Sequence, residues 1–266
     1  MIAQLLRLAC RGAWIARTFA VVLAVTTVSA CATPSSGPQG AHDDAGAQNL
    51  LALADATLAG GDARAAVTLY RRAIAAAPEA VGPRLALAEA YYRIGSLTEA
   101  RVAYAAVRDD APIDADIGLG RVALALMQGD VAARHFAAVL TAEPDNVEAL
   151  NGVGVAHDLV GQHQRAQLAY AEALAVDPTN RAVANNEALS LILSGDWDGA
   201  VERLQRLAGD ALSFPEARHN LALAYGLAGD ETNARRLLAA ELGAEEVDDN
   251  LAFYRAARGL SPAAGG

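Results

Sequence analysis

A block of 34 residues recurs along this chain, and its internal spacing constrains the fold more than any other feature of the sequence. In residues 147–180, small, apolar and aromatic side chains stand at block positions 4, 7, 8, 11, 20, 24 and 27, and a proline stands at position 32. Residues three or four apart share one face of a helix, so the block predicts two helices that face each other. The residues in question are Leu150, Val153, Gly154, His157, Ala166, Tyr170, Ala173 and Pro178.

Turn residues mark the ends of the two predicted helices. Gly161 is expected to end the first helix, because glycine adopts the left-handed conformation that other residues resist. Pro178 is expected to end the second, because it lacks an amide hydrogen and disfavours helical angles at the residue before it. Each block is therefore a helix–turn–helix unit.

The same pattern recurs on both sides of this block. It predicts six units and a C-terminal capping helix with a tail, at residues 47–80, 81–114, 115–146, 147–180, 181–214, 215–248 and 249–266. The third unit is two residues short, and Leu119-Gly120 and Gly129 cannot both keep the register within it, so either a helix or a turn is shortened there. Pro112 is expected to close the second unit as Pro178 closes the fourth.

This spacing is the tetratricopeptide pattern. It predicts an all-α fold, a right-handed solenoid of about six helix–turn–helix repeats ending in a capping helix that covers the last hydrophobic face. Hydrophobic residues make up 53% of the chain and aromatic residues only 5%, so the core is expected to consist of closely packed Ala, Leu and Val.

The first thirty residues have the layout of a secretory signal. Arg7, Arg11 and Arg17 accompany an apolar run at 19–28 that is too short to span a membrane comfortably. The segment from Val28 to Cys31, VSAC, resembles the bacterial lipobox, which implies that residues 1–30 are removed and that Cys31 carries the lipid, diacylglycerol and palmitate. An ordinary signal peptide and an uncleaved anchor are the alternatives.

The residues after Cys31 bear on localisation. Ala32 stands where an Asp usually marks retention at the inner membrane in lipoproteins, so attachment to the outer membrane, on its periplasmic face, is expected. Residues 31–46 are rich in Pro, Gly, Ser and Asp and predict a flexible tether. Loss of Cys10 with the signal and acylation of Cys31 would leave no cysteine for a disulfide.

Signals for catalysis, cofactors and nucleic acid are missing from the sequence. The G-x-G triplets at 118–120 and 152–154 lie inside predicted helices without a preceding strand, so helix packing is the better interpretation than dinucleotide binding. His157 and His163 do not have metal-ligand spacing. A formal charge of −10 disfavours nucleic acid. We expect no enzyme activity, metal, cofactor or small-molecule substrate.

A groove for a polypeptide remains. In tetratricopeptide repeats the first helix of each pair lines the concave side through positions 2, 5, 6, 9, 12 and 13. Amides there could hydrogen-bond a peptide backbone while leucines bury its side chains; alternatively, the asparagines satisfy helix ends or neighbouring repeats. The expected groove residues are Asn151, Val155, Leu159, Asn185, Asn186, Leu189, Ile192, Leu193, His219, Asn220, Leu223 and Leu227.

Four segments carry a more specific resemblance. They read ALNGVGVAHDLVGQHQRAQLAY (149–170), NNEALSLILSGDWDGAV (185–201), NLALAYGLAGD (220–230) and EEVDDNLAFYRA (245–256). Together they resemble the TadD family of Flp, or tight adherence, pilus assembly lipoproteins. The resemblance implies a non-enzymatic outer-membrane lipoprotein that supports assembly of the pilus secretion machinery or localisation of its secretin, and Glu187 departs from the apolar residue usual at repeat position 7.

Two other classes stay open at this stage. Another periplasmic repeat lipoprotein, such as a type IV pilotin or an adaptor for outer-membrane protein assembly or cell-wall enzymes, would share the repeats and the anchor. An enzyme or activator domain would need an activity independent of the groove.

Overall fold

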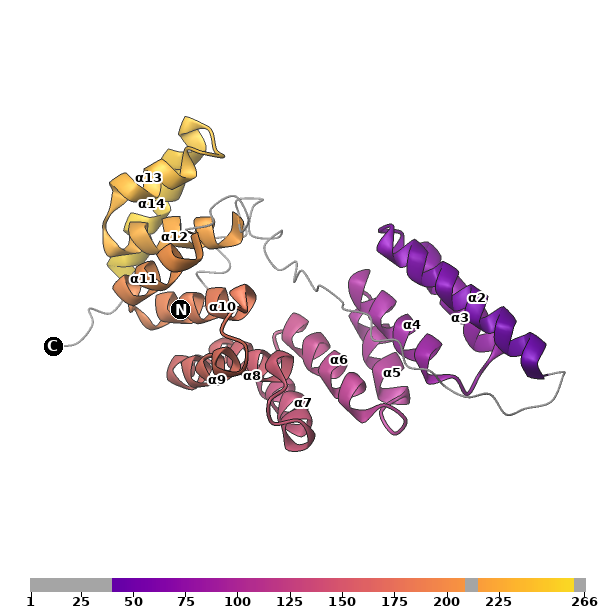
Figure 1. Ribbon diagram of the computed structural model, residues 1–266. Helices are drawn as coiled ribbons and strands as arrows, with labels where there is room; N and C mark the ends of the chain where they lie inside the picture. Colours follow the sequence, from indigo (N-terminus) through magenta and orange to yellow (C-terminus); the bar gives the residue numbers. More distant parts are fainter. Residues whose placement is uncertain (1–39, 209–214, 261–266) are drawn as a thin grey trace. The chain divides into compact units, whose positions relative to one another are not determined.

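The computed structural model describes residues 40–208 and 215–260, and within those ranges every regular element is an α-helix (Figure 1). This confirms the predicted all-α fold. The described residues form two compact units, 40–156 and 157–260, and the division falls within helix α8 (Val147–Leu159).

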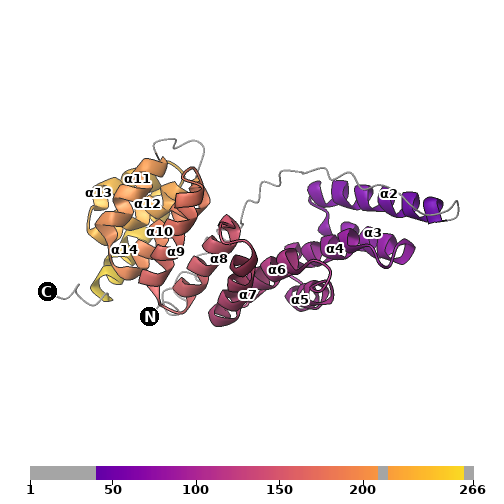
Figure 2. The same ribbon diagram turned by 60° about the horizontal axis from the view of Figure 1, so that its bottom comes forward.

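The unit 40–156 consists of consecutive helices that pack against their neighbours in the chain (Figures 1 and 2). The first helices of successive pairs also contact one another, α2 with α4 and α4 with α6. The helices are α2 (Gly40–Ala59), α3 (Ala63–Ala76), α4 (Val81–Arg93), α5 (Leu97–Ala106), α6 (Pro112–Ala125) and α7 (Gly129–Ala142), followed by the start of α8.

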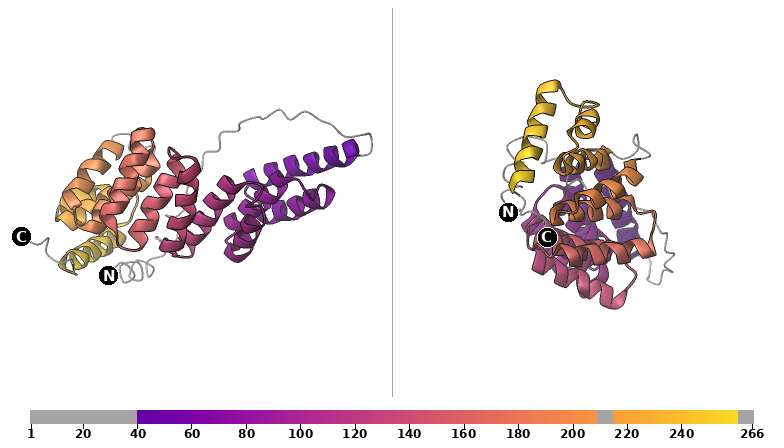
Figure 3. Two further views of the ribbon diagram at one scale, coloured as in Figure 1. Left: turned by 90° about the horizontal axis from the view of Figure 1, so that it is seen from below. Right: turned by 90° about the vertical axis from the view of Figure 1, so that its left-hand side faces the viewer.

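The unit 157–260 continues with six further helices, which Figure 3 shows in two views. They are α9 (His163–Val176), α10 (Arg181–Ser194), α11 (Trp197–Ala208), α12 (Pro215–Ala228), α13 (Glu231–Leu238) and α14 (Ala244–Leu260). Helix α14 packs on both α12 and α13, and buries Val247, Leu251 and Tyr254 there. It covers the exposed side of the last pair, as a cap must, although it begins five residues earlier than the expected start at 249.

Phe136 shows why glycine recurs at helix positions in this fold. A Cβ added to Gly120 would lie 2.7 Å from its ring, and one added to Gly152 would lie 2.5 Å from it, so the ring fills the space between α6 and α8 that both glycines leave. The ring of Tyr104 fills the space beside Gly118 in the same way. The two G-x-G triplets therefore lie inside helices and serve packing.

The left-handed turn between paired helices falls on glycine five times, at Gly61, Gly95, Gly161, Gly195 and Gly229. In the third repeat the equivalent residue is Met127, with φ of 58°, and it stands 32 residues after Gly95 and 34 before Gly161. The two missing residues therefore lie between Gly95 and Met127. Gly129, the other candidate for this turn, is the first residue of α7.

Helix α5 is the shortened element. It has 10 residues, whereas α3, α7 and α9 each have 14. The expectation that Pro112 closes the second repeat is wrong, because Pro112 is the first residue of α6. A proline is accepted there since the first helical residue needs no intrahelical amide bond.

The N-terminal segment differs from expectation in one respect. Helix α2 begins at Gly40, so residues 40–46 are helical where a flexible tether was expected, and no proline follows Pro38 to interrupt that helix. The signal peptide and Cys31 lie outside the described residues. Among the helices that the structure describes, none combines the length and apolarity needed to cross a membrane.

Candidate partner-binding surface

The expected groove residues are carried by three first helices, α8, α10 and α12. Helices α8 and α10 both begin at an asparagine cap: Asn146 Oδ1 accepts from the amide of Ala149 at 2.9 Å, and Asn180 Oδ1 accepts from that of Val183 at 3.1 Å. Asn151 and Val155 belong to the unit 40–156, and the other ten expected residues belong to the unit 157–260.

Asn185 and Asn220 bond to each other. The Nδ2 group of Asn220 donates to Oδ1 of Asn185 at 2.8 Å, which joins α12 to α10, and Asn185 is only 8% exposed. A buried amide needs such a partner, so this pair has the geometry of a bond between neighbouring repeats. The Oδ1 atom of Asn185 thus already has a donor within the protein.

The apolar residues among the expected groove residues differ in how deeply they are buried. Ile192 and Leu227 are buried in a core cluster with Leu204 and Leu221, so they offer little surface to a partner. Leu193 is 37% exposed on α10. The remaining members of the expected groove are half-buried and keep part of their surface accessible: Asn151, Val155, Leu159, Asn186, Leu189, His219, Asn220 and Leu223.

His219 faces a charged group on a neighbouring element. Its Nε2 atom lies 2.7 Å from Oε2 of Glu241, and Arg218 forms an ion pair with the same carboxylate. Glu241 comes from the turn after α13, so this cluster ties the start of α12 to the next helix pair. His219 is therefore held in place by a carboxylate of the protein itself.

Two carboxylates on the first helices are satisfied by internal partners. Asp158 accepts hydrogen bonds from Tyr170 Oη at 3.0 Å and Ser190 Oγ at 2.8 Å, and its Oδ1 lies 2.8 Å from His163 Nδ1. Because the Ser190 hydroxyl bonds to the carboxylate and not to an imidazole, the group is not a nucleophile–base pair. Glu187, unusual for its repeat position, forms an ion pair with Arg203.

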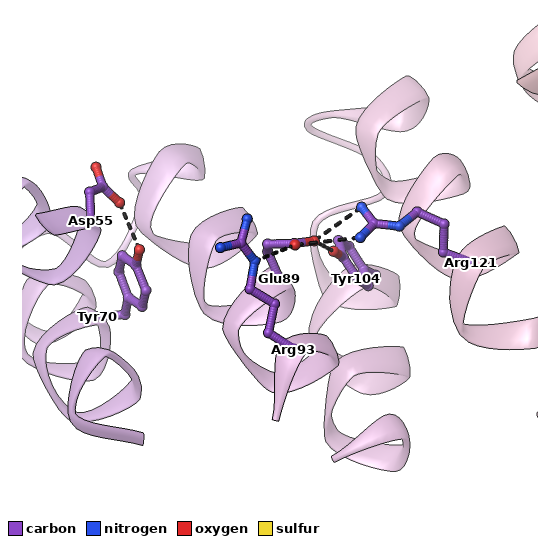
Figure 4. A network of polar contacts seen from close by, with 6 residues as sticks. All are labelled: Asp55, Tyr70, Glu89, Arg93, Tyr104 and Arg121. Carbon is purple, nitrogen blue, oxygen red and sulfur yellow. Dashed lines mark hydrogen bonds and ion pairs between the residues drawn. The ribbon is translucent and has the colours of Figure 1, made fainter. Parts of the chain in front are cut away.

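The unit 40–156 holds a polar cluster that sequence reasoning missed. With Met127 as the third turn, Arg121 moves to repeat position 9, the position that Asp55 and Glu89 hold in the first two repeats. Figure 4 shows these three side chains with Tyr70 and Tyr104 of the second helices. The sequence carried one signal for this cluster: Asp55 and Glu89 are 34 residues apart, and so are Tyr70 and Tyr104.

Glu89 is the centre of this cluster. Its carboxylate accepts from Tyr104 Oη at 2.9 Å and from Arg93 Nε at 2.9 Å, and Arg121 Nη1 lies 3.1 Å from its Oε2 atom. The Arg121 guanidinium also stacks over the Tyr92 ring, 4.5 Å from its centroid. Tyr70 makes the equivalent bond in the first repeat, donating to Asp55 Oδ1 at 2.7 Å.

Glu148, the second residue of α8, is close enough to this cluster for its pKa to respond to the charges of Glu89 and Arg121, and its electrostatics differ from those of Glu89. Burial acts to raise the pKa of Glu89, but the Arg121 charge and hydrogen bonds from Arg93 and Tyr104 hold that pKa below its ordinary value. Burial raises the pKa of Glu148, and the negative charges of Glu89 and Asp114 add to this against the opposing charge of Arg121. The cluster therefore combines a well-paired carboxylate with a poorly compensated one.

The geometry supports binding better than catalysis. Among the residues described, no three His, Cys, Asp or Glu side chains are grouped so that they could hold a metal ion. Asn185 and Asn220 of the first helices are bonded to each other, and leucines lie beside them on α10 and α12. Such surfaces recognise extended or helical polypeptides through apolar pockets and amides.

Comparisons with known proteins agree with this fold. Two family models of the tetratricopeptide repeat match residues 57–120 and 117–181. The uncharacterized protein y4yS of Sinorhizobium fredii is 36% identical over 95 residues, which are 34% of this chain and 52% of that protein. The chain thus spans about half the length of this curated relative.

Solved structures extend the likeness over more of the chain. A thermophilic tetratricopeptide repeat protein of Thermus thermophilus has a TM-score of 0.59 at 20% identity, covering 67% of this chain and 98% of that one. One from Parabacteroides merdae has 0.60 at 14%, covering 79% and 98%. The pilF protein of Pseudomonas aeruginosa has 0.64 at 15%, covering 79% and 99%. The chain therefore has the tetratricopeptide-repeat fold.

Proposed function

We propose that this chain is a non-enzymatic scaffold of the bacterial outer membrane that binds a polypeptide in the assembly of a Flp-type pilus secretion system. The partner we propose is the pilus secretin or another assembly component. The lipid on Cys31 would hold the protein at the periplasmic face, and the repeats would present the binding surface to the partner.

The observation that carries this proposal is the row of first helices with accessible leucines next to amides. Leu189 and Leu193 of α10 and Leu223 of α12 keep surface accessible beside Asn186, while the Asn185–Asn220 bond fixes the two helices relative to each other. A surface whose backbone is held by internal bonds loses little conformational entropy when it binds.

A role as a type IV pilotin is the second candidate. It is favoured by the likeness to the pilF protein of Pseudomonas aeruginosa, a pilus-related protein of which 99% is covered. The identity of 15% makes this a likeness of fold, so the pilotin role rests on shared architecture. Both candidates predict a secretin as partner and differ in the pilus system to which that secretin belongs.

Envelope crosslinking followed by affinity capture tests the proposal. The proposal predicts recovery of a Flp-system secretin or assembly protein with the wild-type chain, and recovery of a type IV secretin would favour the second candidate. Capture of cell-wall enzymes with no pilus component would overturn both.

Replacing Cys31 by serine tests the anchor separately. The Cys31→Ser chain should lose lipid label and leave the outer-membrane fraction, because a non-lipidated serine cannot insert acyl chains. Unchanged membrane fractionation of Cys31→Ser would contradict the lipid anchor without bearing on partner binding.

A further inference from the structure

A small cavity lies between α5, α6 and α7, within the unit 40–156, and none of its lining residues occupies a groove position. Its volume is about 170 Å³, and its walls are Leu119, Val122, Ala123, Leu126 and Val131, with Arg101, Gln128 and His135 completing the lining. An apolar cavity of about 150 Å³ holds one benzene ring, so this one has room for a single aromatic or aliphatic side chain.

The cavity forms where a pair of side chains found at other steps of the chain is replaced by alanines. Tyr91, at repeat position 11, accepts a hydrogen bond from Arg71 Nε at 3.1 Å, and Tyr225 at the same position accepts one from Gln205 Nε2 at 2.6 Å. In the third repeat the equivalent residues are Ala123 and Ala105. The bridging pair is thus present at the steps into the second and sixth repeats, and this cavity lies at a step without it.

The rim of the cavity carries exposed apolar surface on a strained turn. Leu126 is 39% exposed and Met127 is 58% exposed, and both belong to the turn between α6 and α7. Met127 adopts the left-handed conformation that glycine has at the five equivalent turns. A methionine there costs conformational energy and gains little burial in this chain, and such strain is characteristic of binding sites.

The charge at the rim is positive. Arg101 is exposed and makes no hydrogen bond or ion pair with any residue that the structure describes. His135 Nδ1 lies 2.8 Å from Oδ1 of the buried Asp116, which also pairs with Arg108, so that carboxylate already has two partners within the protein. The charged group left to meet a ligand at this cavity is therefore the Arg101 guanidinium, which favours a carboxylate.

We propose that this cavity docks a peptide segment of a protein partner, which inserts one bulky apolar side chain and sets an acidic side chain against Arg101. The site is separate from the groove and does not depend on the proposed function. The apolar side chain fills the space left by Ala123 and contacts Leu126 and Met127 at the rim. The segment's carboxylate neutralises the unpaired guanidinium.

Fluorescence polarisation with defined peptides tests this docking site on the full chain purified in detergent. The probes are three labelled octapeptides of Gly and Ser that differ at the centre: phenylalanine–aspartate, phenylalanine–lysine and alanine–aspartate. The phenylalanine–aspartate probe should bind at least about 10-fold more tightly than either of the others, a factor equivalent to 1.4 kcal/mol. Equal binding of the three probes would overturn the proposal.

Two variants locate the binding. Ala123→Leu fills the cavity from within. It should weaken binding of the phenylalanine–aspartate probe at least about 10-fold without lowering the melting temperature of the protein. Arg101→Gln should abolish the preference for aspartate over lysine. If Ala123→Leu has a lower melting temperature than the wild type, Leu126→Ser at the exposed rim is the variant to use instead. The same loss of probe affinity is expected for it.

Three further outcomes would contradict the site. Unchanged affinity in both Ala123→Leu and Leu126→Ser would place the probe elsewhere, and an unaltered preference in Arg101→Gln would remove the role of the guanidinium. Light scattering supplies the third: a wild-type dimer that Leu126→Ser converts to monomer would make a second copy of this chain the occupant, in place of the acidic segment.

Discussion

Asn220 donates a hydrogen bond to the side chain of Asn185 from the next first helix, at a distance of 2.8 Å. This bond gives Asn185 of α10 and Asn220 of α12 a role between repeats. We predict that Asn185→Ala lowers the free energy of unfolding by about 1 to 3 kcal/mol, because it leaves a half-buried amide donor without its acceptor. Urea denaturation measures this change.

A double-mutant cycle separates that bond from the loss of side-chain volume. Asn185→Ala with Asn220→Ala should cost less than the sum of the single variants, with a coupling energy of about 0.5 to 1.5 kcal/mol. Additive costs would mean that the bond contributes nothing to stability.

Met127→Gly should stabilise the protein by about 1 kcal/mol, because a residue with a Cβ is strained at the φ of 58° found here. The exposed methionine side chain loses little burial when it is removed. Met127→Ala is the matched control, since it shortens the side chain and keeps the strain. Equal unfolding midpoints for the glycine and alanine variants would show that the turn is unstrained.

Gly152→Ala should destabilise by about 1 to 3 kcal/mol, because the added methyl group meets the Phe136 ring at 2.5 Å and that ring already fills the space beside Gly120 on α6. Gly82→Ala, also in a first helix, meets only Leu51 Cδ2 at 3.9 Å and should be neutral or slightly stabilising. Thermal unfolding compares the two. Similar melting temperatures of the two variants would contradict the packing of the Phe136 ring against Gly120 of α6 and Gly152 of α8.

Glu89 should make stability depend on pH in the acid range. Its pKa is lower in the folded protein than the ordinary value of 4.5, so its stabilising contribution is fully present above that value and is lost as the pH falls through the folded pKa. Glu89→Gln should cost about 1 to 3 kcal/mol at neutral pH and lose less stability than wild type between neutral pH and pH about 3. Urea denaturation measures the free energy of unfolding of both proteins at each pH. If the two free energies fell in parallel with pH, the Glu89 network would be contradicted.

The helix pairs could be predicted from sequence because their signals are local. Residues three and four apart define the packed faces, and Gly161 marks a turn by a conformation that few other residues accept. The position of the two-residue deletion was not accessible in the same way, because Met127 occupies the left-handed turn and methionine gives no turn signal. That displaced the register of the third repeat and moved Arg121 away from its groove position.

The site could be predicted only in part, because repeat position does not say what a polar side chain bonds to. Asn185 stands at a groove position, yet its amide meets Asn220 of the next repeat, and that contact depends on the spacing between helix pairs. Ile192 and Leu227 are buried for the same reason, through packing between successive pairs that a single helical wheel does not contain.

Affinity of the purified Flp-system secretin for surface variants of this chain tests the central claim most directly. Leu193→Arg places a charge on the accessible leucine of α10, and Leu168→Arg places the same charge on an exposed leucine of the second helix α9. The proposed scaffold predicts at least about 10-fold weaker binding for Leu193→Arg and wild-type binding for Leu168→Arg. Equal affinity of both variants and the wild type, or no binding of the secretin to any of them, would contradict it.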